Sequence, residues 1–174
     1  MTSPARHPRA VEPGPGQESV WDYPRPPALV PSSRHVVVTA RDGTAAEAVL
    51  ADTAGAWRVL ETSHPPTWYL PREDVRAELR RSAAAPTTCE FKGAATYWDV
   101  VLPGGEVLEA AAWSYESPTP AFAKIAGHVS LRPGVLACRV DGELARPQEG
   151  AFYAGWITDD VVGPFKGEPG THGW

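Results

Sequence analysis

The sequence predicts a single compact, mainly β domain with two short helices, on three observations. Its 174 residues suffice to build one hydrophobic core. Short runs rich in β-branched and aromatic residues alternate with turn signals at Asp42-Gly43, Pro103-Gly104-Gly105 and Asp141-Gly142, a pattern typical of hairpins. The proline-rich residues 1–34 favour neither a helix nor a central strand, because proline lacks the amide hydrogen that both require.

The N-terminal third is expected to contain a tail, an arm and four strands. Residues 1–18 are predicted to be a disordered tail, and residues 19–34 an extended arm that Trp21 and Tyr23 pin to the domain. Strands are expected at Val36–Thr39, Thr44–Ala51, Trp57–Thr62 and Trp68–Leu70.

The first helix is predicted to begin at Pro71, because proline suits the first helical turn. Glu73 and Asp74 then lie where the helix dipole favours anions, and basic residues as far as Arg81 lie toward the opposite end.

The second half is expected to hold a central hairpin, a second helix and a wrapping tail. The strands are Thr87–Gly93, Ala94–Leu102 and Glu106–Tyr115. Thr119-Pro120 resembles the start of a helix whose apolar positions are Phe122, Ile125, Ala126 and Val129. A last hairpin spans residues 135–145, and the glycine-rich tail 152–174 wraps the sheet through its aromatic residues.

Charged residues are dispersed along the chain. Sixteen Lys and Arg against twenty-one Asp and Glu give a net charge of −5, so we expect no nucleic-acid partner. The N-terminus has no apolar signal segment, and no stretch approaches the roughly 20 apolar residues of a membrane span. We therefore expect a cytoplasmic protein without membrane contact.

The two cysteines, Cys89 and Cys138, lie far apart, and neither belongs to a Cys-x-x-Cys pair. We accordingly predict no metal site and no cofactor. Free cysteine is among the most buried residue types, so a structural thiol is expected at both positions.

Strand alternation makes Glu61 a candidate functional residue, because it shares a face with Trp57 and Val59. If that face is the core, the carboxylate needs a partner. If the strand ends before Glu61, the carboxylate lies in water, and the sequence leaves both outcomes open.

Lys92 is the second candidate, because it interrupts a run typical of a strand. Alternation puts Cys89 and Phe91 on one face and Lys92 on the other, which separates thiol from ammonium. A bulge at Gly93 would turn Lys92 into a cleft. The alternative is a solvated lysine on the outer face.

The pattern Cys-x-aromatic-Lys-Gly-x-Ala-x-Tyr, present from Cys89 to Tyr97, resembles the bacterial family called "domain of unknown function 427". The resemblance also includes Glu61-Thr62 and Trp113–Tyr115, and it extends over nearly all of residues 19–174. It implies a β-tent or Mss4-like arrangement of two sheets. The family is sometimes labelled nucleotidyltransferase-like, but the chain has neither a Gly-Ser with a following Asp-x-Asp nor a phosphate-binding Gly-x-x-x-x-Gly-Lys-[Ser/Thr].

The favoured function is the binding of a small molecule in an aromatic pocket with a Glu/Lys pair. The predicted ligand-binding residues are Glu61, Thr62, Tyr69, Lys92, Tyr97, Trp113 and Tyr115. One alternative is an enzyme in which Glu61, Lys92 and Tyr97 perform acid/base chemistry, with the pKa of Lys92 lowered by burial or the pKa of Glu61 raised. A second is a protein-interaction module that presents residues 23–27 as a polyproline surface. The sequence identifies neither the ligand nor the oligomeric state, and it does not decide whether the protein is an enzyme.

Overall fold

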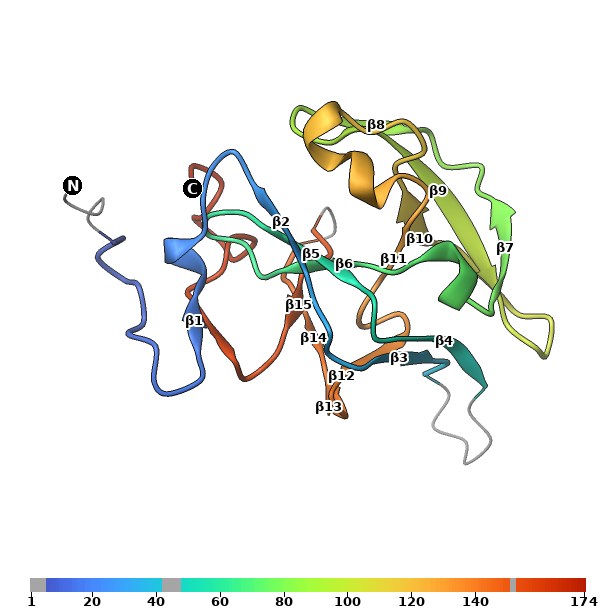
Figure 1. The fold of residues 1–174 in the computed structure, drawn as a ribbon, viewed down its shortest axis with the longest axis horizontal. Coiled ribbons are helices and arrows are strands. Elements are labelled where there is room, and N and C mark those ends of the chain that lie inside the picture. The colour runs from blue at the N-terminus through green and yellow to red at the C-terminus, as the bar shows by residue number, and fades with distance from the viewer. Residues whose placement is uncertain (1–5, 42–47, 151–152) are drawn as a thin grey trace.

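The regular secondary structure of the described chain consists mainly of short β-strands (Figure 1). The computed structural model describes residues 6–41, 48–150 and 153–174. Its helical segments are 3₁₀ helices of three to six residues: η1 (Val20–Asp22), η2 (Arg72–Asp74) and η3 (Pro120–Ile125). The mainly β prediction is confirmed. No helix among these residues is long and apolar enough to cross a membrane.

Three larger sheets form the body of the described chain. A five-stranded sheet has the order β11-β10-β9-β7, with β8 also paired to β9. Its strands are β7 (Glu78–Arg81), β8 (Thr87–Cys89), β9 (Gly93–Val101), β10 (Val107–Ser114) and β11 (Val129–Leu131).

The other two larger sheets have the orders β13-β12-β3-β4 and β2-β5-β6. The first contains β3 (Val36–Thr39), β4 (Val49–Thr53), β12 (Ala137–Val140) and β13 (Glu143–Leu144). The second contains β2 (Ala28–Pro31), β5 (Trp57–Leu60) and β6 (Thr67–Tyr69). The predicted turn at Asp42-Gly43 lies outside the described residues, although β3 and β4 do pair.

The β9–β10 hairpin is buried on both faces, which makes it the structural centre. On one face Val100 and Ala112 belong to a core shared with Val38 of β3. On the other face Ala95 and Trp113 belong to a second core. Successive residues of a strand point to opposite faces, so the same two strands support both the main core and the pocket described below.

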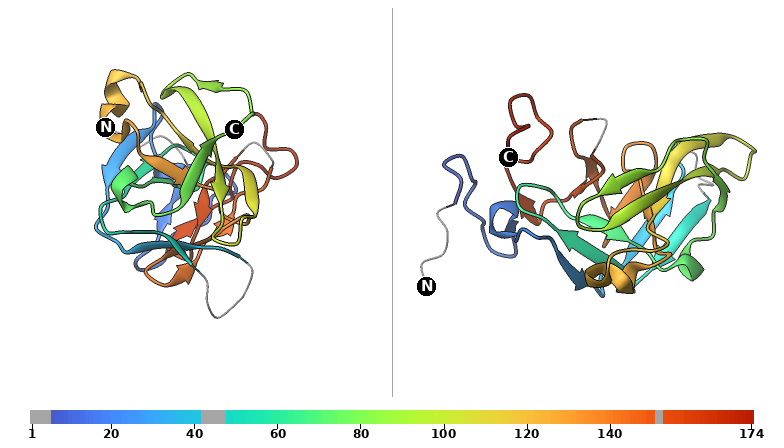
Figure 2. Two further views of the ribbon diagram at one scale, coloured as in Figure 1. Left: turned by 90° about the vertical axis from the view of Figure 1, so that its right-hand side faces the viewer. Right: turned by 90° about the horizontal axis from the view of Figure 1, so that it is seen from above.

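The two ends of the described chain lie side by side at one end of the molecule (Figures 1 and 2). β1 (Glu18–Ser19) pairs in parallel with β16 (Val161–Val162), and β14 (Arg146–Pro147) pairs with β15 (Trp156–Ile157). His7 stacks on Trp21 with ring centroids 4.4 Å apart, and Trp174 meets Trp21 edge-on at 5.1 Å. N-terminal and C-terminal aromatic side chains thus pack directly against each other.

The helix predicted after Pro71 is wrong beyond Asp74. Residues 78–81 form β7, which pairs with Trp98–Val101 of β9. The amides of Arg76 and Ala77 donate to the Leu50 carbonyl, so a sheet partner distant in the sequence outweighs local helix propensity. The second predicted helix is also shorter than expected: η3 ends at Ile125, and Val129 already belongs to β11.

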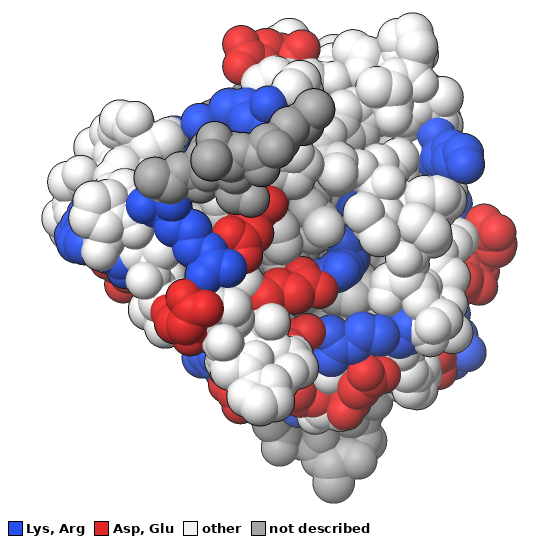
Figure 3. All heavy atoms as spheres, turned by 60° about the vertical axis from the view of Figure 1, so that its left-hand side comes forward, with Lys and Arg blue, Asp and Glu red and all other residues white. Residues whose placement is uncertain are grey.

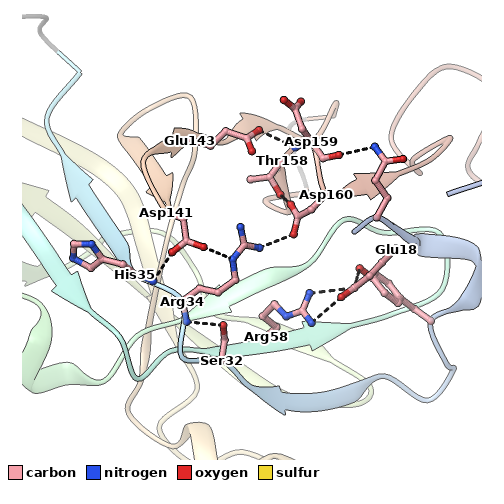
Figure 4. Close-up of polar contacts among 12 residues, drawn as sticks. Glu18, Ser32, Arg34, His35, Arg58, Asp141, Glu143, Thr158, Asp159 and Asp160 are labelled. Atoms are coloured by element: carbon pink, nitrogen blue, oxygen red, sulfur yellow. Dashed lines mark hydrogen bonds and ion pairs between the residues drawn. The ribbon is translucent and has the colours of Figure 1, made fainter. Parts of the chain in front are cut away.

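Arg34 joins three segments that lie far apart in the sequence (Figure 4). Its guanidinium donates to Asp141 Oδ2 at 2.8 Å and to Asp160 Oδ2 at 2.5 Å. The hydrogen bond from Arg34, with one from the His35 amide, lowers the pKa of Asp141. Burial opposes ionisation of Asp160, but the Thr158 hydroxyl and Arg34 lower its pKa overall. On the face of the molecule that Figure 3 shows, acidic and basic side chains lie next to each other, so neither sign of charge forms a large patch there.

Replacing Arg34 by methionine should lower the free energy of unfolding by about 1 kcal/mol at pH 7, since its ion pairs are partly exposed. The native pKa values of both aspartates are depressed, so their stabilisation is present above the unfolded value of about 3.9 and disappears as pH falls through the native values. Urea unfolding at several pH values measures the effect: the difference in unfolding free energy between wild type and R34M should become smaller below about pH 4. The control is R80M, because the one ion pair of Arg80 within the described part of the chain joins it to exposed Glu78. If the difference in unfolding free energy between wild type and R34M stays the same at low pH, Arg34 acts through packing.

Candidate functional site: an aromatic pocket between two sheets

A pocket of about 220 Å³ lies where the three-stranded and five-stranded sheets approach each other. Leu70, after β6, and Val129 of β11 exchange two backbone hydrogen bonds of 2.8 Å and join the sheets there. The pocket brings together six of the seven predicted ligand-binding residues: Glu61, Tyr69, Lys92, Tyr97, Trp113 and Tyr115.

Aromatic side chains from three segments of the chain form one wall of the pocket. Trp113 of β10 stands opposite Tyr97 of β9 in the sheet register. Its indole donates to the Tyr69 hydroxyl at 3.3 Å, and the two rings meet edge-to-face at 6.5 Å. Tyr115 lies 6.1 Å from Tyr69, and burial raises the pKa of its phenol. The wall is thus a largely apolar surface that also carries hydroxyl groups.

Lys92 reaches this pocket because the chain turns at residues 90–92. Cys89 pairs with Gly93 across the β8–β9 hairpin, so the continuous strand Thr87–Gly93 expected from the sequence is wrong. The predicted separation of Cys89 and Lys92 onto opposite faces is wrong for the same reason, since both line the pocket. Thr119 holds the turn by donating its amide to the Lys92 carbonyl at 3.1 Å and its hydroxyl to the Phe91 carbonyl at 2.6 Å.

The Lys92 ammonium lies among groups that stabilise its positive charge. Its Nζ is 5.6 Å from the centroid of the Tyr115 ring, within the range of a cation–π contact. Burial alone would lower the pKa of Lys92, but the electrostatic influence of Tyr69, Cys89 and Glu61 outweighs burial and raises that pKa. Lys92 is therefore a cation at neutral pH, contrary to the lowered pKa in one form of the enzyme hypothesis.

Glu61 is only partly buried, with 22% of its side chain exposed. Its Oε1 lies 3.8 Å from Nε of Arg25, and its Oε2 lies 3.6 Å from Nδ1 of His64. Glu61 directly follows the last residue of β5. Its carboxylate is therefore neither enclosed in the core nor fully in water, which were the two outcomes that the sequence left open. The Glu61 carboxylate has an arginine partner at the rim of the pocket.

His64 is a pocket residue that the sequence did not indicate. Burial lowers its pKa, assisted by Lys166 and Arg25 and opposed by Glu61. Its Nδ1 lies 2.9 Å from the Thr62 carbonyl oxygen. A carbonyl can only accept, so Nδ1 carries the proton in this hydrogen bond, and the imidazole is neutral at pH 7 with Nε2 unprotonated.

Thr62 lies outside the pocket, unlike the other predicted ligand-binding residues. Its hydroxyl donates to the Tyr23 carbonyl and its amide to the Pro24 carbonyl. Arg25 in turn donates to the Thr62 carbonyl at 3.1 Å. Thr62 thus fastens the N-terminal arm, including part of the proline-rich segment, to the domain.

The remaining pocket residues come largely from segments without a local motif. Gln148 bridges two tail segments: its Nε2 donates to the Lys166 carbonyl at 2.7 Å, and its Oε1 accepts from the Gly155 amide at 3.1 Å. The prediction that the tail wraps the sheet pointed toward this region but not to particular residues. The other lining residues that were not predicted are Pro65, Thr67, Thr87, Thr88, Arg132, Tyr153 and Ala154.

The pocket combines charged and hydroxyl groups with an aromatic surface. It offers two cations, Lys92 and Arg132, and one carboxylate, Glu61. Within residues 6–41, 48–150 and 153–174, no three His, Cys, Asp or Glu side chains are arranged to hold a metal ion.

Fold and pocket together define a mainly β protein with an aromatic-walled site between two sheets. The chain belongs to the family described as "Domain of unknown function (DUF427)", whose sequence model matches residues 28–146. The match is narrower than the 19–174 suggested by the resemblance and leaves out three pocket residues: Gln148, Tyr153 and Ala154. No curated protein shows a significant similarity to the chain.

Proposed function

We propose that the protein binds a small molecule in the pocket between the three-stranded and five-stranded sheets. The observation that carries the proposal is the convergence of Tyr69, Trp113 and Tyr115 with the Glu61 carboxylate and the Lys92 ammonium in one concave site. Binding sites of this kind combine apolar and aromatic walls with a few polar groups that orient the ligand. The volume of about 220 Å³ suits a ligand smaller than a typical drug molecule.

As part of the same proposal, we retain the β-tent or Mss4-like arrangement of the sheets. Such an arrangement would place the pocket in the angle between two sheets, where facing side chains diverge enough to leave space for a ligand. Its support is the pair of backbone hydrogen bonds that joins the sheets at Leu70 and Val129.

An enzymatic role for Glu61, Lys92 and Tyr97 is the second candidate, because all three side chains line the same pocket. The raised pKa of Lys92 favours a charged group that attracts an anion over a proton acceptor. The Tyr97 hydroxyl lies 2.7 Å from Oγ1 of Thr87. Binding therefore remains the better-supported role.

Replacing Trp113 by phenylalanine should weaken binding of a pocket ligand about tenfold, because it removes the indole from the wall and leaves the Tyr69 hydroxyl without its donor. The ligand is the molecule that native mass spectrometry detects with the gently purified protein, and its affinity for each variant is then measured by calorimetry. The matched control is Trp98→Phe. Trp98 lies on the opposite face of the same hairpin, outside this pocket, and its indole donates to the Ser114 hydroxyl at 2.9 Å.

The proposal predicts a loss of affinity for W113F alone, with both variants folded by circular dichroism. Equal affinity in W113F, W98F and wild type would show that the ligand binds elsewhere. If no molecule co-purifies, a fragment screen followed by the same two variants makes the same comparison.

A further inference from the structure

Charged side chains of both signs line the pocket, in a chain whose net charge is −5. Lys92 and Arg132 are positive and Glu61 is negative. The Glu61 carboxylate lies 3.8 Å from Arg25 at the rim. This carboxylate is thus engaged by a cation other than Lys92.

Lys92 is stabilised as a cation by a thiol and an aromatic ring rather than by an ion pair. Among the described residues it forms no ion pair with a carboxylate, while Glu61 pairs with Arg25. Its immediate neighbours are the Cys89 thiol and the face of the Tyr115 ring. Withdrawing an ammonium from water is unfavourable unless an anion or several hydrogen-bond acceptors replace the water.

The surface beside Lys92 is aromatic, and its rings are tilted: the Tyr69 ring makes an angle of 48° with Tyr115 and of 89° with Trp113. The Tyr115 ring lies under its ammonium, and Tyr69 and Trp113 continue the wall. Arg132 lies over Trp113, with its guanidinium carbon 5.8 Å from the ring centroid. A ligand whose ring packs on this wall would bring a substituent toward Lys92 and Arg132.

We propose that the ligand of this pocket is a small planar organic anion, with its carboxylate or other singly charged acidic group on Lys92 and its ring on the wall of Tyr69, Trp113 and Tyr115. The inference rests on the proposed function and names its ligand class. Hydrogen bonds between charged groups are roughly twice as strong as neutral ones, which favours an anionic over a neutral ligand of the same shape.

The test uses the full chain and four probes: benzoate, benzamide, benzylamine and inorganic phosphate. The first three share one ring and differ in charge, while phosphate carries charge without a ring. Binding is measured by isotope-edited NMR titration at constant ionic strength. Benzoate should bind at least tenfold more tightly than benzamide and benzylamine, and phosphate more weakly than benzoate.

Three lysine variants separate the charge of Lys92 from its packing. K92M should lower benzoate affinity about tenfold and leave benzamide affinity unchanged, while K92R should keep benzoate affinity within a few-fold of wild type. The control is K124M, because Lys124 lies over Trp57 outside the pocket. If K92M does not fold, K92R and R132M compared with K124M test the same selectivity.

The outcomes distinguish the two claims. Equal or tighter binding of benzamide or benzylamine in this pocket would overturn the anionic ligand and leave small-molecule binding in place. Tighter binding of phosphate than of benzoate would overturn the planar part of the inference. If no probe binds, the inference fails; if in addition no molecule co-purifies and the fragment screen finds no ligand, the proposed function fails as well.

Discussion

Replacement of Trp156 by alanine is expected to destabilise the protein by about 3–5 kcal/mol, the usual cost of removing a buried tryptophan. Its side chain is 0% exposed, in the core that the four-stranded and five-stranded sheets share. The indole donates to the Leu131 carbonyl at 3.1 Å and lies 5.9 Å from the Trp68 ring. The substitution would leave a large cavity and a buried carbonyl without its donor. Equilibrium urea unfolding measures the loss.

The matched control for Trp156 is Trp174 of the same tail. Trp174 is only half-buried, and its ring meets those of His7 and Trp21 at the end of the molecule. W174A should therefore cost about 1 kcal/mol, a typical value for a partly exposed site. Equal losses in W156A and W174A would show that the tail docks as one surface segment and that the core does not extend beneath it.

The hairpins of this protein were predictable because their signals are local. Asp141-Gly142 joins β12 to β13 with φ angles of 49° and 85°, the left-handed backbone that Asp-Gly readily adopts. Pro103-Gly104-Gly105 likewise separates β9 from β10. In both cases the turn residues and the flanking β-branched residues favour the same structure, so the pattern suffices without knowledge of the fold.

The helix after Pro71 was not predictable, because the structure of residues 78–81 depends on a distant partner. Their charges suit a helix, but β9 presents an edge to which Leu79 and its neighbours pair as β7. Such tertiary pairing commonly overrides a difference in intrinsic propensity of a few tenths of a kcal/mol per residue. No local pattern signals that edge.

The candidate site likewise contains features that local sequence patterns predict and features that depend on the rest of the fold. Alternation correctly placed Tyr97 and Trp113 within strands, and their cross-strand pairing puts them in one wall. The neighbouring positions of Cys89 and Lys92 followed instead from a three-residue turn that the alternation concealed. Gln148 had no signal, since its place in the pocket depends on how the tail returns to the domain.

Gly167 controls how the C-terminal tail returns to the domain, because its backbone lies against the backbone of Glu149. Its φ is +121°, and a Cβ on it would lie 2.9 Å from the Glu149 carbonyl carbon and closer still to the carbonyl oxygen. Neither group is a flexible side chain that could move aside. The preceding Lys166 accepts from Gln148 at 2.7 Å and donates its amide to the Ser63 carbonyl at 2.8 Å. A shift at Gly167 would therefore reach the pocket.

Gly167→Ala is accordingly expected to lower the free energy of unfolding by about 3 kcal/mol, from backbone strain and close contact together. It should also weaken ligand binding, because Gln148 lines the pocket. The control is Gly170→Ala, three residues further on. Gly170 also has a positive φ, +85°, but a Cβ there would meet nothing within 4 Å, so its cost should be about 1 kcal/mol and ligand affinity should not change. Urea unfolding and calorimetric titration of both variants measure these effects. If G167A and G170A lose the same stability, strain at positive φ accounts for both, and the contact with Glu149 does not constrain the tail.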